Sequence, residues 1–186
     1  NYYAAGTAVV EDITVRRFPV RRRDTQAFDR VNRKLMDGKQ ISPKEEQIFV
    51  EEMVNSPQLY EYMRDAQDEY GLYVFIPYMF GTTYYGMQVC PEQSVLIPCF
   101  HDEAYVYMRL FRQAYVKARG MIYNAMPEME LANWVYDFTT TEQICMGIGM
   151  DTKIQSDADA FRKQFGIDKP FILYAGCLLY TSPSPR

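Results

Sequence analysis

The residues best suited to chemistry lie in one short stretch, Val95 to Glu103, which reads Val-Leu-Ile-Pro-Cys-Phe-His-Asp-Glu. An apolar run leads through a proline to His101, the only histidine of the chain. Open α/β sheets bind ligands at the carboxyl ends of their strands. An imidazole there can accept or donate a proton or a hydrogen bond near neutral pH. His101 is therefore a candidate functional residue. The alternative is a capping histidine that bonds the neighbouring backbone.

Asp102 and Glu103 follow His101 directly and precede a helical pattern that begins near Ala104. Acidic groups in a first helical turn stabilise the helix dipole, by about 0.3–1 kcal/mol each. We expect that role or contact with a substrate. A metal-dependent hydrolase site built on His101, Asp102 and Glu103 is a weaker hypothesis, because consecutive residues seldom converge on one ion.

Further candidates follow the apolar run 72–77. Tyr78, Thr82 and Thr83 should reach the same rim of the sheet as His101, and we assign them to substrate binding. A threonine here could instead cap the next helix.

Asn124 and Glu128 follow the apolar run 121–123 and occupy the equivalent position. We assign Asn124 to substrate binding. Glu128 is more simply a first-turn acid of the next helix.

These residues must be positioned by alternating strands and helices. Strands that are apolar throughout and alternate with helices predict a parallel sheet covered on both faces, in a Rossmann-like α/β layout. The expected strands are 13–18, 72–77, 95–99, 121–123 and 143–146. The expected helices are 25–36, one beginning after Ser42 with Pro43 and Glu45, one from Ser56-Pro57 to Gly71, a short one after 81–83, 104–117 and 127–136.

The pattern changes after Gly147-Ile148-Gly149. A polar stretch reads as a linker, and a helix over 157–165 and a strand over 171–174 follow. The last ten residues, 177–186, do not continue the pattern. They are similar to translated sequencing-adapter read-through, and we interpret them as an artefact; a genuine Pro/Ser tail is the alternative.

The composition of the chain argues against several classes of protein. The 186 residues include 16 Tyr and 11 Phe, which is typical of a globular chain, and the net charge of −4 argues against nucleic-acid binding. The four cysteines match no zinc or redox spacing, so reduced thiols in a cytoplasmic protein are expected. No run approaches the roughly 20 apolar residues of a transmembrane helix, and no signal peptide opens the chain.

Four stretches together resemble the retaining glycosyltransferases of family 4, which have a GT-B fold of two Rossmann-like domains. Asn1-Tyr2-Tyr3 with 15–19 resembles an early strand of that family, and Pro98 to Glu103 resembles its Pro-x-x-His-Asp-Glu turn. Residues 147–151 resemble the Gly-x-Gly-Val-Asp crossing between domains, and 161–166 with 170–176 resemble the start of the second domain. Cys177 departs from the Arg or Lys usual in the family after Gly176.

The resemblance implies an enzyme that transfers a hexose, with retention, from a nucleotide diphosphate sugar to a glycan or lipid-linked acceptor, as in polysaccharide biosynthesis. His101 would lie beside the transferred sugar, and no metal or other cofactor would be needed. The implied layout is an acceptor-side domain over 1–148 without its first strand, a linker over 149–156 and the start of the nucleotide-sugar domain over 157–176. Truncated at both ends, such a fragment would be inactive alone.

Two alternatives concern partners. A non-catalytic Rossmann-like module could bind a ligand or protein partner through the same rim. The five arginines at 16, 17, 21, 22 and 23 could contact anionic lipid at the inner face of the plasma membrane. Because Glu11, Asp12 and Asp24 lie nearby, we expect a solvated face instead.

Overall fold

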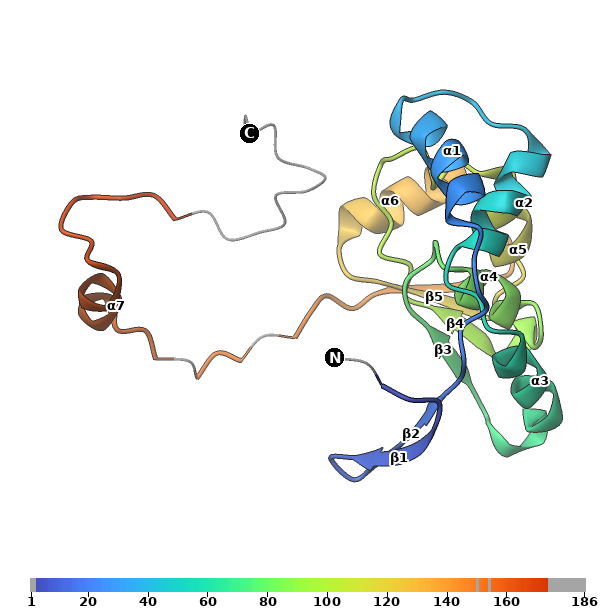
Figure 1. Cartoon of the computed structure of the whole chain (residues 1–186), viewed down its shortest axis with the longest axis horizontal. Coiled ribbons are helices and arrows are strands. Elements are labelled where there is room, and N and C mark those ends of the chain that lie inside the picture. Colours follow the sequence, from blue (N-terminus) through green and yellow to red (C-terminus); the bar gives the residue numbers. More distant parts are fainter. Residues whose placement is uncertain (1–2, 150, 154, 174–186) are drawn as a thin grey trace. The chain divides into compact units, whose positions relative to one another are not determined.

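The computed structural model describes residues 3–149, 151–153 and 155–173 (Figure 1). The chain divides into two compact units, Asn1–Ile148 and Gly149–Arg186, and each is described by itself. The first unit contains a hairpin, three helices and a sheet with alternating helices. Its elements are β1 (Gly6–Val10), β2 (Ile13–Arg17), α1 (Thr25–Met36), α2 (Pro43–Glu52), α3 (Pro57–Asp65), β3 (Tyr73–Phe75), α4 (Gly81–Met87), β4 (Ser94–Leu96), α5 (Arg109–Tyr115), β5 (Gly120–Tyr123), α6 (Met126–Val135) and β6 (Glu142–Cys145), with 3₁₀ turns at Gln67–Glu69 and Pro91–Gln93.

Helix α1 begins and ends as its sequence pattern predicts, and helix α2 begins at its predicted cap. Phe28, Val31 and Leu35 lie one helical turn apart and are buried on one side of α1. At the start of α2, Ser42 and Glu45 form a complete capping box, in which each side chain bonds the other residue's backbone N–H. The predicted helix 25–36 and the predicted cap at Ser42 are both confirmed.

Four strands form one parallel sheet in the order β3-β4-β5-β6. The register pairs Val74 with Val95, Val95 with Gly120, and Gly120 with Glu142. The predicted mixed α/β fold with a parallel sheet flanked by helices is confirmed. Each strand pairs with the next one along the chain, so every crossover moves across the sheet in the same direction.

Among the residues that the structure describes, helices cover only one face of this sheet. Right-handed crossovers in one direction place α4, α5 and α6 on the same side, and α1, α2 and α3 pack against that helical layer. Phe75, Leu96 and Met121 point to this side and line the core. The prediction of helices on both faces is therefore wrong for the residues that the structure describes.

The opposite face of the sheet carries a row of isoleucines, one from each strand or from the residue after it. The residues are Ile76, Ile97, Ile122 and Ile144. The two outer members are 58% and 53% exposed, whereas the two inner members are half-buried. This apolar row is called the isoleucine face below.

Two glycines of α4 allow close packing instead of making turns. A Cβ on Gly81 would lie 2.4 Å from the carbonyl oxygen of Val50 and 2.9 Å from that of Val54. A Cβ on Gly86 would lie 2.6 Å from the ring of Phe75. The helix α4 can therefore approach both α2 and the sheet only without side chains at these positions.

The hairpin of β1 and β2 precedes the helices. Glu11 and Asp12 form its turn, both with positive φ (49° and 63°), as a two-residue hairpin turn of the primed type requires. The predicted strand over 13–18 is confirmed as β2, whereas β1 was not predicted.

The second unit contains helix α7 (Ala158–Phe165), which confirms the predicted helix over 157–165. Arg162 donates to the carbonyl oxygens of Ile167 and Lys169 at 3.2 Å, which fixes the segment after the helix. The predicted strand over 171–174 is wrong for its described part, because 171–173 pairs with no strand. Residues 174–186, which include the suspected artefact, lie outside the described residues.

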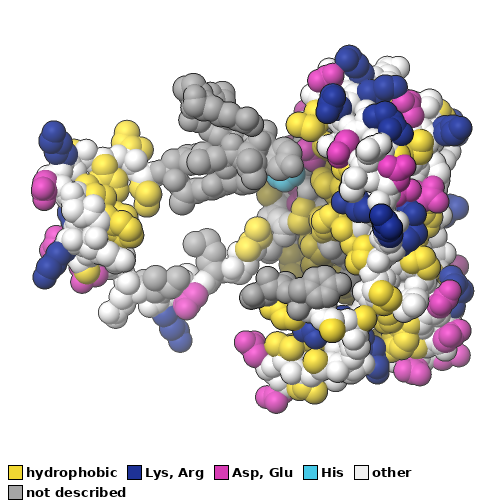
Figure 2. Space-filling model, viewed as in Figure 1, with side chains coloured by type: hydrophobic (Ala, Val, Ile, Leu, Met, Phe, Trp, Pro, Cys, Tyr) yellow, Lys and Arg dark blue, Asp and Glu magenta, His cyan; other side chains and the backbone are white. Residues whose placement is uncertain are grey.

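The arginines near the hairpin engage separate partners. Arg16 lies over the ring of Tyr62, with its guanidinium carbon 5.3 Å from the ring centroid, and Arg21 pairs with Glu52 at 2.9 Å. Figure 2 shows basic and acidic side chains intermixed over the helical side of this unit. No helix in the described part of the chain is long and apolar enough to cross a membrane.

Candidate functional site

The candidate site is the carboxyl rim of the parallel sheet, which comprises the segments that follow β3, β4 and β5 (76–80, 97–108 and 124–125). Beyond β4, side chains alternate between the core and solvent: Pro98 and Phe100 are buried, Cys99 is half-buried and His101 is exposed. Phe100 packs against Tyr78, with ring centroids 4.8 Å apart. This buried anchor holds the next residue, His101, at the surface of the rim.

Cys99 adopts a left-handed backbone conformation, with φ of 56°. Such a conformation is uncommon for a residue with a side chain, and strained backbone of this kind is concentrated at functional sites. The thiol accepts a hydrogen bond from the Asn124 amide at 3.5 Å, and burial raises its pKa. Cys99 was not singled out from the sequence, since nothing about a cysteine after a proline signals this conformation.

Glu128 joins two segments of the rim. The residue is 8% exposed, and its carboxylate accepts one hydrogen bond from the backbone N–H of Phe100 and one from that of Asn124, both at 2.8 Å. Glu128 does lie in the first turn of α6, as expected. Its main partners, however, are backbone groups that follow β4 and β5, so it fixes the position of the loop that carries His101.

Asp102 and Glu103 do not open a helix, and the predicted start near Ala104 is wrong. Residues 101–108 form a series of turns, and α5 begins only at Arg109. The reason is a distant acid: Glu46 of α2 is buried and accepts from the backbone N–H groups of Arg109 and Leu110 at 2.9 and 3.0 Å. These two bonds satisfy the amino end of α5 from outside its own segment.

The loop 101–108 is instead fixed by hydrogen bonds to residues outside it. Glu103 accepts from the Tyr78 hydroxyl at 3.3 Å, and Tyr105 donates to the Asn32 side chain at 2.7 Å. The Tyr136 hydroxyl donates to the carbonyl oxygen of Val106 at 3.1 Å. The loop is therefore held at three points and presents His101 from a fixed backbone.

Tyr78 supports this loop from below. Its side chain is fully buried, its backbone N–H donates to Pro98, and its carbonyl oxygen accepts from the buried Tyr115 hydroxyl. Burial raises the pKa of Tyr78 well above its ordinary value. The structure thus places Tyr78 beneath the rim, where it can hold Glu103 but cannot touch a ligand on the surface.

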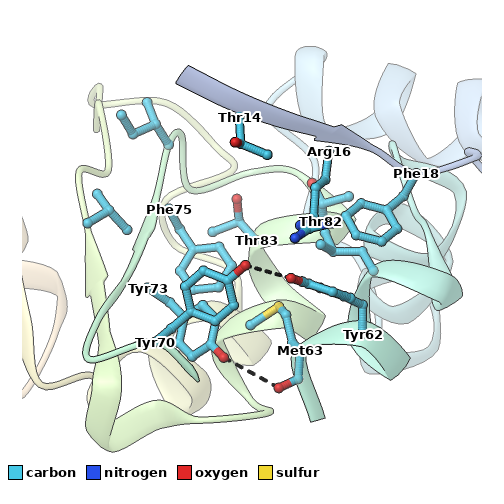
Figure 3. Close-up of a pocket in the computed structure, with 13 residues that line it drawn as sticks. Thr14, Arg16, Phe18, Tyr62, Met63, Tyr70, Tyr73, Phe75, Thr82 and Thr83 are labelled. Carbon is cyan, nitrogen blue, oxygen red and sulfur yellow. Dashed lines mark hydrogen bonds between the residues drawn. The ribbon is translucent and has the colours of Figure 1, made fainter. Parts of the chain in front are cut away.

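Thr82 and Thr83 lie in the first turn of α4 and line a cavity of about 570 Å³ (Figure 3). The cavity lies between the hairpin, α3 and the free edge of β3. Thr83 is buried and donates to the carbonyl oxygen of Pro77 at 2.7 Å. The alternative that a threonine caps the helix is wrong, because the N-cap of α4 is Phe80 and no described side chain bonds the first backbone N–H groups of the helix. His101 does not line this cavity, so the structure does not bring the threonines together with it.

The walls of that cavity are mostly aromatic and aliphatic. The hydroxyls of Tyr62 and Tyr70 bond each other at 2.5 Å, and Tyr73 donates to the carbonyl oxygen of Met63 at 3.4 Å. These polar groups are occupied by one another or by backbone. They offer no acid–base pair for catalysis.

His101 is the group at the rim that is free to act on a ligand. Its side chain makes no hydrogen bond or ion pair with another residue that the structure describes, and it is exposed. Within the described ranges, no three His, Cys, Asp or Glu side chains gather as metal ligands. Asp102 bonds Tyr107 and Glu103 bonds Tyr78, so neither acid converges with the imidazole.

The chain was compared with models of protein families, with curated proteins and with solved structures, and none of them matches it.

Proposed function

We propose that this chain is the acceptor-side part of a retaining glycosyltransferase of family 4, with a GT-B fold. The whole enzyme would move a hexose from a nucleotide diphosphate sugar to a glycan or a lipid-linked acceptor. The observation that carries the proposal is the exposed imidazole of His101 on a fixed loop at the carboxyl rim of a parallel sheet. The ordered sequence resemblance supports the same activity.

Sugar transfer requires that donor and acceptor be held in a reactive geometry and that the departing diphosphate be stabilised. In this proposal His101 orients the transferred sugar or the acceptor by a hydrogen bond. Glu128 and Tyr78 act through the backbone and the loop, as positioning residues. The diphosphate would be bound by the second domain, for which 157–176 supplies the beginning.

The test is transfer activity in a protein that includes the complete second domain. Release of nucleoside diphosphate is measured with a panel of nucleotide sugars, with and without oligosaccharide acceptors. His101→Ala should lower kcat by at least about 100-fold, the usual contribution of a positioned catalytic group, while the circular dichroism spectrum stays unchanged. Lys44→Ala, an exposed change on α2, is the control and should retain activity.

Equal turnover of His101→Ala and wild type would reject the assigned role. If the wild-type protein binds saccharides or nucleotide sugars but transfers nothing under any of these conditions, the non-catalytic binding module replaces the transferase.

A further inference from the structure

Two aromatic side chains lie together on the surface beside the rim. Trp134, near the end of α6, is 74% exposed, and Tyr107, in the loop 101–108, is 38% exposed. Their ring centroids are 5.9 Å apart at an interplanar angle of 85°. Tryptophan and tyrosine are enriched at binding surfaces, because each combines a large apolar ring with a polar group.

Asp102 fixes the position of Tyr107. The Tyr107 hydroxyl donates to the Asp102 carboxylate at 2.6 Å, and this bond raises the pKa of Tyr107 to about 12. The phenol therefore stays protonated and its ring is held edge-on to Trp134 before any ligand arrives. Since Asp102 follows His101 directly, the aromatic pair and the imidazole are presented by the same fixed loop.

Tyr107 also lines a cavity of about 360 Å³. The segment between α1 and α2 lines it with Lys39, Gln40 and Ile41, and the loop 101–108 lines it with Tyr107 and Met108. This volume falls within the range of roughly 300–1,000 Å³ that is usual for ligand sites. The mixture of an apolar floor and polar side chains suits a ligand that has both kinds of surface.

We propose that Trp134 and Tyr107 form a platform for a pyranose ring of the acceptor. The sugar stacks on the exposed Trp134 ring, the perpendicular Tyr107 ring borders it, and Asp102 accepts hydrogen bonds from the sugar hydroxyls. A pyranose presents C–H groups on its faces and hydroxyls at its edge, which matches an aromatic surface beside a carboxylate. The inference deepens the proposed function, and in naming the sugar as the acceptor it rests on that function. A glycan bound here would extend along the loop toward His101.

The charges around the platform disfavour the other ligands that bind tryptophan. Asp102 lies against Tyr107, and helix α6 presents the exposed Glu130 and carries no basic residue. Lys39 in the adjoining cavity is paired with Asp37 at 2.9 Å. An anionic membrane or a nucleoside diphosphate would meet these carboxylates. A neutral, hydroxyl-rich ligand would not.

Trp134 is the only tryptophan of the chain, so its fluorescence reports on this site alone. The chain is titrated with maltotetraose and with cellotetraose, and glycerol serves as the control for bulk hydroxyl groups. We expect a saturable change of emission with at least one tetrasaccharide, at a Kd on the order of 1 mM, as is usual for a shallow site. Glycerol should give a linear change only.

Variants separate the platform from a general effect on the fold. Tyr107→Ala and Asp102→Ala should each weaken saccharide binding by about tenfold or more, and Tyr107→Phe should weaken it less, because the ring is kept. Tyr70→Phe removes a hydroxyl from the other cavity and should bind as wild type. Trp134→Ala, measured by saturation-transfer NMR of the saccharide, should abolish the signal while the circular dichroism spectrum stays unchanged.

The absence of a saturable response to both tetrasaccharides would overturn the platform, and so would a response that Trp134→Ala leaves intact in the NMR measurement. Saturable binding of uridine diphosphate or of phosphatidylglycerol vesicles in place of the saccharides would also overturn it. This titration needs no donor domain. Saccharide binding by a protein that transfers no sugar would therefore reject the proposed transferase activity and leave the platform. Transfer by Trp134→Ala at an unchanged acceptor KM would reject the platform and leave the transferase activity.

Discussion

Glu128 shows how one buried side chain can hold a candidate site together. Its two oxygens each accept a backbone N–H, one from Phe100 and one from Asn124. Removing the carboxylate leaves the buried N–H of Phe100 and the partly buried N–H of Asn124 unpaired. A fully buried loss costs about 1–3 kcal/mol, and a partly buried one costs less because water can replace the acceptor. We therefore expect Glu128→Ala to lower the free energy of unfolding by about 2–4 kcal/mol, measured by urea denaturation.

Glu130→Ala is the matched control, because this exposed glutamate lies on the same helix. Its effect should stay within about 0.5 kcal/mol, as for most surface substitutions. Equal losses of unfolding free energy in the two variants would show that the stability of the rim does not depend on the hydrogen bonds of Glu128.

At this scale the sequence predicts which residues follow a strand but not what they touch. His101 lies where the strand pattern predicts, exposed at the carboxyl end of β4. Tyr78 and Glu128 were harder to place, because their roles depend on partners 25 and 28 residues away. No local pattern encodes such pairs.

The start of α2 is the element whose sequence signal is most complete, and its charge makes it sensitive to pH. Hydrogen bonds from Lys34 and, with a smaller effect, from Ser42 lower the pKa of Glu45 from 4.5 to about 2. A carboxyl group with a lowered pKa stabilises the fold above its unfolded value and loses that effect as the pH falls toward its folded value. The stabilisation should thus be present above pH 4.5 and disappear between about pH 4.5 and 2.

Glu45→Gln tests this linkage. The loss of thermal stability of this variant relative to wild type should be constant from pH 7 to 5 and should shrink below pH 4.5. The loss should be small, because Glu45 is only half-buried and its partner Lys34 is exposed, so solvent screens the ion pair. Glu51→Gln, an exposed change on the same helix, is the control. A difference between wild type and Glu45→Gln that grows on acidification would contradict the assignment.

Other elements show why local patterns fail. The helix expected from Ala104 begins five residues later because Glu46, on a different helix, supplies the cap at Arg109. The sequence pattern predicts β2 but not β1, because the Glu-Asp turn between them lacks the Asn or Gly that marks such turns. The segment 171–173 is apolar, but it pairs with no strand of the described residues, and a strand forms only where another strand pairs with it.

For the whole molecule, the alternation of apolar strands and helices predicted the parallel sheet but not how its faces are covered. Coverage follows from strand order, which a single sequence does not reveal. Because β3 to β6 succeed one another across the sheet, right-handed crossovers place all their helices on one side. The isoleucine face is the direct result.

An apolar sheet face in water is an unfavourable surface, and proteins that expose one tend to associate. We expect concentration-dependent self-association of this chain, measured by sedimentation velocity over a dilution series. Ile144 is 53% exposed at the outer end of the row, and Ile144→Thr keeps the β-branched shape while adding a hydroxyl. This variant should shift the association to higher concentration and change the free energy of unfolding by no more than about 0.5 kcal/mol.

Val9→Thr, an equally conservative change at a 69% exposed position of the hairpin, should leave the association unchanged. A wild-type chain that stays monomeric at every concentration, or equal shifts in the two variants, would mean that the isoleucine face does not drive association.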